Sequence, residues 1–183
     1  MILPIHVYGD PVLRKLAEEV DVENTDWKPF VADMFETMYH ANGVGLAAPQ
    51  VGKAIRVFVI DTEPFKESYP DVRIHKGAFI NPLITKEWGD DFVFGEGCLS
   101  LPNINEDVTR KSNIHIEYYD EEGNFHDEDF DGIAARVIQH EYDHLEGHVF
   151  VDRLTPIKKM VLKRQLNDIA SGKTKAAYKT VHK

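Results

Sequence analysis

The sequence contains a single cysteine and no long run of apolar residues. Cys98 is the only thiol among 183 residues, so no internal disulfide can stabilise the fold. A lone thiol is typical of proteins in reducing compartments. No stretch of about 18 consecutive apolar residues occurs, and the first residues lack the basic and then apolar pattern of a secretory signal. We therefore expect a cytoplasmic protein with no membrane-spanning segment.

Positive charge is also scarce. The 31 acidic residues outnumber the 21 basic ones, which gives a formal net charge of −10. Such a balance argues against an extended nucleic-acid-binding face, so DNA is not an expected partner. With 43% hydrophobic residues, the chain is expected to bury one core. We predict a single domain over residues 1–172 and a basic, flexible tail over residues 173–183.

The hydrophobic pattern predicts helices towards both ends of the chain and strands between them. The predicted helices are Pro11–Val20, Trp27–His40 and a last helix with Thr155 as N-cap that runs through Ile169. The predicted strands are 56–60, 78–84, 92–94 and 114–120, with turns at 89–90 and 122–124. Strands that occur in runs, without regular alternation with helices, indicate an α+β fold. We expect mixed or antiparallel sheets packed around a central helix, with flanking N- and C-terminal helices.

The central helix is predicted between Asp131 and Gly147. Asp131 is suited to cap the N-terminus of the helix, and glycine is the usual residue just beyond a C-terminus. The helix contains the pattern H-E-x-x-H, formed by His140, Glu141 and His144. Two histidines four residues apart on a helix can offer two nitrogen ligands to one cation.

The two histidines are expected to face inward. At about 100° per residue, His140 and His144 fall on the same stripe of the helix as the apolar Ile133 and Val137. Imidazoles on an apolar stripe point into the core, where Glu141 beside the first of them can reach a water on the same cation. This helix is therefore the predicted metal-binding element.

The identity of a third ligand decides between several kinds of site. Two histidines on a helix can also be solvated surface residues or hydrogen-bonded core groups. The longer metalloprotease pattern fails, because Phe150 stands where its last histidine would be. A downstream carboxylate, Asp168, would give a thermolysin-like site, whereas Cys98 would give a thiolate site. A lone cysteine is otherwise most often a small buried hydrophobe.

Three separated segments carry a family resemblance. They are Gly43–Gln50 (GVGLAAPQ), Glu96–Ser100 (EGCLS) and Gln139–Gly147 (QHEYDHLEG). Together they resemble the three signature motifs of peptide deformylases, enzymes that remove the formyl group from the initiator methionine of new bacterial polypeptides. The resemblance covers most of the chain. It departs from some members in having no arginine shortly after the motif cysteine, since the first one is Arg110.

The resemblance implies one divalent metal ion per chain, bound by Cys98, His140 and His144. It implies ferrous iron as the ion in the cell, and a mixed sulfur and nitrogen ligand set also accepts zinc, nickel or cobalt. Thiolate and ferrous iron together imply sensitivity to oxygen.

The resemblance also assigns catalytic and substrate-binding roles. Glu141 would accept a proton from the attacking water and return it to the departing amine. The side-chain amide of Gln50 and the backbone N–H of Leu99 would stabilise the developing oxyanion. The backbone near Val44 and Gly45 would pair with an extended peptide. The residues expected around the methionine side chain are Val44, Phe94, Ile133 and Val137, each equally suited to a hydrophobic core.

The predicted function is therefore hydrolysis of the N-formyl group, with a formyl-methionyl peptide as partner and formate as product. The resemblance also allows a transient contact with the ribosome. A zinc-dependent endopeptidase of the H-E-x-x-H type is the alternative enzyme, and a structural or sensory metal-binding domain is the non-enzymatic alternative. The polar segment 62–77 is expected to be a surface loop and is assigned no role.

Overall fold

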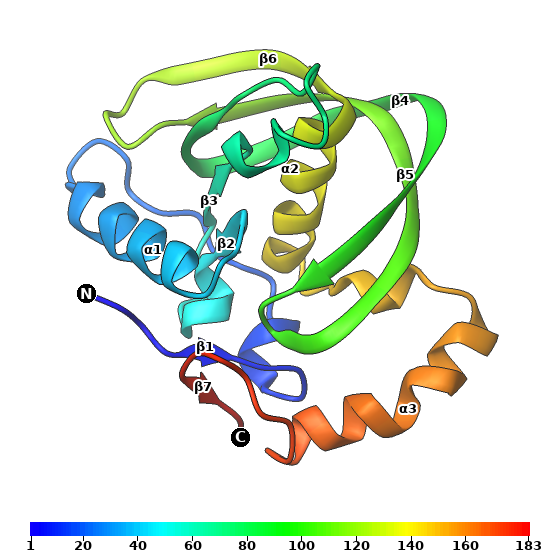
Figure 1. Cartoon of the computed structure of the whole chain (residues 1–183). Helices are drawn as coiled ribbons and strands as arrows, with labels where there is room; N and C mark the ends of the chain where they lie inside the picture. Colours follow the sequence, from blue (N-terminus) through cyan, green and yellow to red (C-terminus); the bar gives the residue numbers. More distant parts are fainter.

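A five-stranded antiparallel sheet curves around one central helix in the computed structural model, which describes the whole chain, Met1–Lys183 (Figure 1). The order of strands in this sheet is β2-β3-β4-β5-β6. Its strands are β2 (Gly45–Ala47), β3 (Val57–Asp61), β4 (Lys76–Cys98), β5 (Leu101–Tyr119) and β6 (Phe125–Asp131). The helices are α1 (Lys28–His40), α2 (Gly132–Leu145) and α3 (Pro156–Ala170). The predicted α+β class is confirmed, and none of the helices combines the length and apolar character that a bilayer crossing would need.

Strands β4 and β5 form one long hairpin. The predicted strands 78–84 and 92–94 are parts of β4, so the turn predicted at 89–90 is wrong. The register shifts between Trp88 and Asp91, and Gly89 adopts a φ of 89° there. Many β-bulges, like tight turns, need a residue with a left-handed backbone conformation. Gly89 therefore marks an irregularity within the strand pair and not a turn between strands. The hairpin ends at a tight connection, where Cys98 pairs with Leu101.

Helix α2 is almost completely enclosed by the sheet. Twelve of its fourteen residues are buried, and the small Ala134 and Ala135 let the helix lie close to the strands. As predicted, Asp131 occupies the N-cap position, although its side chain makes no capping hydrogen bond. Gly147 follows the helix with a φ of 78°, and a Cβ there would lie 2.7 Å from the carbonyl oxygen of Arg14. The sequence pattern thus placed the ends of this helix correctly.

The helix predicted over Pro11–Val20 is reduced to one 3₁₀ turn, Pro11–Arg14. Beyond it, the backbone N–H of Ala17 donates to the carbonyl oxygen of Leu145 at 2.9 Å, and that of Glu18 donates to the carbonyl oxygen of Ala54 at 3.0 Å. These tertiary hydrogen bonds replace the helical ones, so local periodicity was overridden by long-range pairing. The predicted helix at Trp27–His40 is confirmed as α1, and Thr155 caps α3 as predicted.

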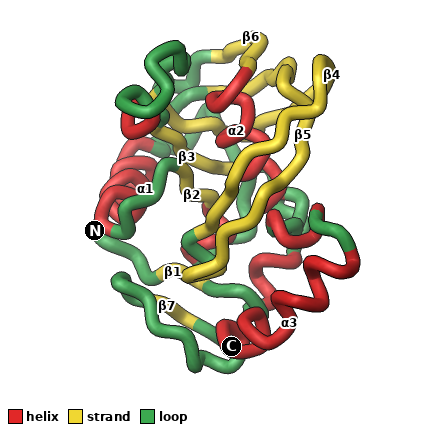
Figure 2. The backbone as a smooth tube through the Cα atoms, turned by 45° about the vertical axis from the view of Figure 1, so that its right-hand side comes forward, coloured by secondary structure: helices red, strands yellow, loops and turns green.

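The segment 173–183, predicted as a basic, flexible tail, contains one element of regular structure. It contains β7 (Thr180–Val181), which pairs in parallel with β1 (Ile5–His6) near the N-terminus. Figure 2 shows these two short strands side by side, next to the end of the β4–β5 hairpin. Segments near the two ends of the chain therefore meet beside the tip of that hairpin.

The core beneath α2 depends on stacked aromatic rings. Phe79 is fully buried, and the centroid of its ring lies 4.7 Å from that of Phe58 and 4.1 Å from that of Tyr118. We predict that Phe79→Ala lowers the free energy of unfolding by about 3–5 kcal/mol, because it removes buried area and leaves a cavity. Phe125→Ala, at a ring that is 55% exposed, should cost about 1 kcal/mol or less. Denaturant unfolding measures both, and equal losses would contradict this description of the core.

Candidate metal centre

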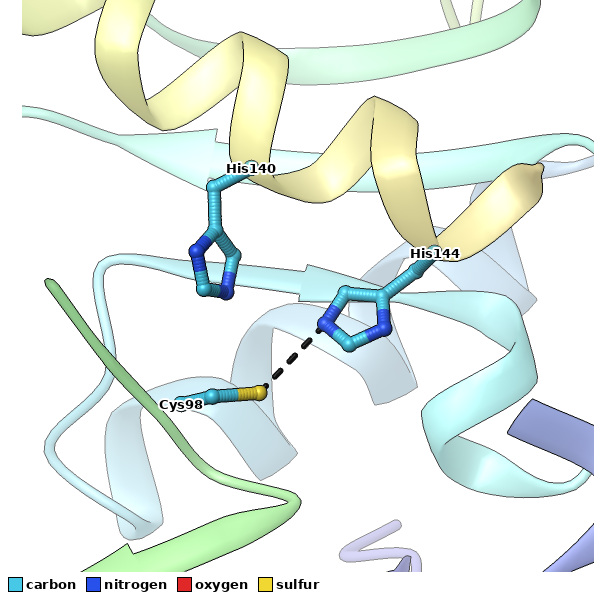
Figure 3. Close-up of side chains that lie close together, drawn as sticks. All are labelled: Cys98, His140 and His144. Carbon is cyan, nitrogen blue, oxygen red and sulfur yellow. Dashed lines mark hydrogen bonds between the residues drawn. The ribbon is translucent and has the colours of Figure 1, made fainter. Parts of the chain in front are cut away.

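The three predicted ligands lie together although they come from two distant parts of the chain. Cys98 is the last residue of β4, and His140 and His144 face it from α2 (Figure 3). One potential ligand atom from each residue lies within 4.8 Å of the others. The Sγ atom of Cys98 is 3.4 Å from Nε2 of His144. Two ligands of one tetrahedral ion, a sulfur at about 2.3 Å and a nitrogen at about 2.1 Å, would be about 3.6 Å apart, so the donor set fits a metal ion.

Two buried polar atoms at this site lack hydrogen-bond partners. Oε2 of Glu141 and Nδ1 of His144 have none, although both residues are buried. Unpartnered buried polar atoms are costly and rare, and functional sites are where they are most often retained. Asp168 lies on α3 and does not belong to the group of ligands, so a thermolysin-like carboxylate ligand is excluded.

A buried carboxylate orients the first histidine. Oε1 of Glu96 lies 2.7 Å from Nδ1 of His140. A carboxylate at Nδ1 selects the tautomer that leaves Nε2 free as a ligand, and it also fixes the plane of the ring. The side chain of Glu96 also accepts hydrogen bonds from Arg110 at 2.7 and 2.9 Å and from Arg136 at 2.7 Å. Sequence reasoning assigned Glu96 no role, because its partners are distant in the chain.

The ionic network continues from Glu96 to the far end of α2. Arg110 donates to Asp143 at 2.8 Å, and Arg153 donates to both oxygens of the same carboxylate at 2.8 Å. Arg110 is therefore committed to two buried acids.

The pKa values of the buried groups at this site are set by burial and by hydrogen bonds to charged neighbours. Burial raises the pKa of Glu141 to about 7 and lowers that of His144 to about 3. Burial alone would lower the pKa of His140, but interactions with Cys98 and Glu96 raise it well above the usual value. Burial alone would raise the pKa of Glu96, but its hydrogen bonds to basic neighbours lower it strongly. Glu96 is thus ionised, whereas His144 has the neutral form in which imidazole binds metals.

Two glycines of the first motif make room for the site. A Cβ at Gly45 would lie 2.5 Å from Oε1 of Glu141, and a Cβ at Gly43 would lie 2.8 Å from Cδ1 of Leu99. Any side chain at position 45 would therefore displace the carboxylate. The glycine-rich segment is explained by close approach and not by the needs of a turn.

A cleft of about 400 Å³ opens over the ligand group. Among the predicted residues, it is lined by Val44, Gly45, Gln50, Phe94, Cys98, Leu99, Val137, His140 and Glu141. Ile133 does not line it and belongs to the core cluster around α2. Ile133 lies seven residues before His140, about 10 Å away along the helix axis.

The cleft also contains residues that sequence reasoning did not assign to it. Phe65 comes from the segment 62–77 and packs edge-on against Phe94, with ring centroids 6.2 Å apart. Tyr178 lines the cleft from the C-terminal segment. Aromatic residues in these largely polar segments were the available signal.

Gln50 is held in a fixed orientation beside the metal ligands. Its Oε1 accepts a hydrogen bond from the backbone N–H of Ala47 at 2.9 Å. Its Nε2 donates to Oγ of Ser100 at 3.1 Å and lies 3.5 Å from Sγ of Cys98. The amide therefore presents its N–H donors to the cleft side that carries the thiol.

A cysteine at the end of a strand that lies against an H-E-x-x-H helix is the arrangement of a metal-dependent hydrolase with a mixed sulfur and nitrogen site. The model of the family "Polypeptide deformylase" matches residues 2–160. The chain is 50% identical over 186 residues to the peptide deformylase of Flavobacterium psychrophilum, covering 98% of this chain and 96% of that one. This chain belongs to the polypeptide deformylase family.

Solved structures agree with this assignment. Peptide deformylase from Thermotoga maritima is 41% identical with a TM-score of 0.75, covering 85% of this chain and 99% of that one. A mutant of peptide deformylase 1B from Arabidopsis thaliana is 32% identical with a TM-score of 0.82, covering 93% and 90% respectively. The α+β fold described above is therefore the fold of this family.

Replacement of Glu96 tests how far the metal site depends on its supporting carboxylate. We predict that Glu96→Gln weakens metal affinity about 10- to 100-fold, because His140 loses the charged partner that orients its ring. Chelator competition measures the affinity, and thermal unfolding reports any loss of the ionic network. Glu106→Gln is the matched control, since Glu106 lies opposite Glu96 on β5 and pairs only with the exposed Lys158. Equal affinities for both variants would contradict the prediction.

Proposed function

We propose that this chain removes the N-formyl group from the initiator methionine of newly synthesised polypeptides and releases formate. The observation that carries the proposal is the group of Cys98, His140 and His144 beside the unpartnered carboxylate oxygen of Glu141. Cys98, His140 and Glu141 of this group line the cleft. The family to which the chain belongs performs this reaction. The proposal places the protein in the cytoplasm with the nascent chains, and a transient ribosome contact stays a prediction.

The three ligands would hold one divalent metal ion and leave a fourth tetrahedral position open. When bound, such an ion supplies Lewis acidity, which lowers the pKa of water towards neutrality and polarises a carbonyl group. One thiolate and two imidazoles suit ferrous iron, the proposed ion in the cell, and also zinc, nickel or cobalt.

Glu141 is the proposed proton carrier. Its Oε2 is buried and free of hydrogen bonds, so it can accept the proton of the attacking water. The same oxygen then returns the proton to the amine as the bond between carbonyl carbon and nitrogen breaks. The backbone at Gly45 lies directly against this carboxylate, because no side chain stands between them.

Gln50 and Leu99 are the proposed oxyanion donors. The amide of Gln50 is already oriented by Ala47, so its Nε2 needs little reorganisation when charge develops on the formyl oxygen. The backbone N–H of Leu99 lies in the turn directly after Cys98. Each donor is expected to contribute about 10²-fold or more to the rate.

The peptide is proposed to bind as an added strand. Strand β2 is at the edge of the sheet and pairs only with β3, so the backbone around Gly45 can pair with an extended peptide. The apolar side chains of Val44, Phe94 and Val137 line the cleft and are proposed to receive the methionine side chain. Ile133, buried in the core, is left out of this pocket.

The proposed function is tested by measuring formate release under anaerobic conditions, together with metal content. Metal-loaded protein is expected to release formate from formyl-methionyl peptides and to leave acetyl-methionyl peptides intact. Internal peptide bonds of unblocked peptides should survive, in contrast to the action of an endopeptidase. Failure of folded, metal-loaded protein to release formate would refute the proposal.

The role of Glu141 is tested by substitution. Glu141→Ala is expected to keep the metal, since none of the three ligands changes, and to lose about 10²-fold or more in kcat. Glu19→Ala, at an exposed glutamate, serves as the control and should match the unsubstituted protein. A Glu141→Ala variant with near-normal kcat would assign the proton transfer to another group.

A further inference from the structure

The turn that carries Leu99 lacks the backbone conformation that usually stabilises a tight hairpin. Cys98 pairs with Leu101, so only Leu99 and Ser100 connect β4 to β5. Favoured two-residue hairpin turns need a residue with positive φ at the first central position. The non-glycine residues with positive φ in this chain are Asn42, Asn81 and Asn103, so neither central residue of this turn qualifies. The connection is irregular, because the register shifts between Gly97 and Cys98, and groups outside the hairpin donate and accept hydrogen bonds at both turn residues.

Strand β1 and the residues just after it fix the second half of the turn. The backbone N–H of Tyr8 donates to the carbonyl oxygen of Ser100 at 2.8 Å. Oγ of Ser100 donates to the carbonyl oxygen of His6 at 2.7 Å and accepts a hydrogen bond from Gln50. Ser100 is therefore held through its backbone and its side chain.

The C-terminal segment fixes the first half of the turn. The phenol of Tyr178 donates to the carbonyl oxygen of Leu99 at 2.7 Å. Burial raises the pKa of Tyr178 to about 12, so the phenol keeps the proton that it donates. Asn103 donates to the carbonyl oxygen of Lys175 at 3.3 Å, and β7 pairs with β1 just beyond. Tyr178 thus approaches the turn from a segment attached on both sides.

We propose that Tyr178 is a positioning residue for the proposed deformylation, because its phenol fixes the Leu99 carbonyl and thereby orients the Leu99 N–H towards the reacting formyl oxygen. The inference rests on the proposed function. The family model ends at residue 160, so the match to the family assigns Tyr178 no role.

The physical link between the two ends of Leu99 is short. Its N–H and its carbonyl belong to adjacent peptide planes that share one Cα atom, and only φ and ψ relate them. Oxyanion donors act at about 2.7–3.1 Å, and a misplacement of about 1 Å can cost 10²-fold in rate. Loss of the Tyr178 hydroxyl group releases the Leu99 carbonyl but leaves Ser100 held by residues 6–8. The expected loss in rate is therefore smaller than about 10²-fold.

Tyr178→Phe removes only the hydroxyl group and is assayed as the metal-loaded full chain. We expect kcat for formate release to fall about tenfold while KM stays within about twofold. The factor should be the same for formyl-methionyl-alanine and for a formyl-methionyl pentapeptide, because the oxyanion is common to both. Metal content and thermal unfolding midpoint should match those of the unsubstituted protein.

Tyr118→Phe is the matched control, since its hydroxyl bonds Glu128 at 3.0 Å, outside the cleft. It should leave kcat unchanged. Unchanged kcat in Tyr178→Phe would overturn the inference, as would a loss confined to KM or to the longer peptide, which would indicate substrate contact. A fall in kcat explained by lost metal or lower stability would overturn it as well. Formate release by the unsubstituted protein tests the proposed function separately in the same experiment.

Discussion

The buried carboxylate of Glu96 joins the strand that carries the thiol to the helix that carries the two imidazoles. It accepts hydrogen bonds from Arg110 and Arg136 and orients His140. Burying ions costs more than their mutual attraction returns unless their hydrogen-bonding geometry is good. Here both carboxylate oxygens have partners, and Asp143 balances the second side of Arg110. The relative position of β4 and α2, and with it the metal site, depends on this interaction.

The local part of the site could be predicted from the sequence. Residues four apart on a helix share a face whatever the rest of the fold does, so His140 and His144 were correctly placed on an inward stripe. The ends of α2 followed from Asp131 and Gly147, because the preferences for capping residues are also local. Cys98 needed more, because no local rule brings a distant strand end to a helix. The resemblance of three motifs supplied that link.

The parts that failed are those in which a distant partner decides the outcome. The segment after Arg14 leaves the helical path because Leu145 and Ala54 offer hydrogen bonds. Gly89 reads as a turn, yet the matching length of β5 keeps β4 continuous through it. Ile133 shares the stripe of the histidines, but the segments that complete the cleft around that stripe come from distant parts of the chain. None of these partners can be recognised within a short window of sequence.

The pairing of β1 with β7 has a consequence for the time at which the site is completed. One support of the Cys98 turn comes from residues 6–8 and the other from Tyr178, so the two are separated by almost the whole chain. During translation, the second support cannot form until residue 178 has left the ribosomal tunnel. Contacts between such remote positions form late in folding. An enzyme that acts on nascent chains would thus acquire its complete site only after most of its own synthesis.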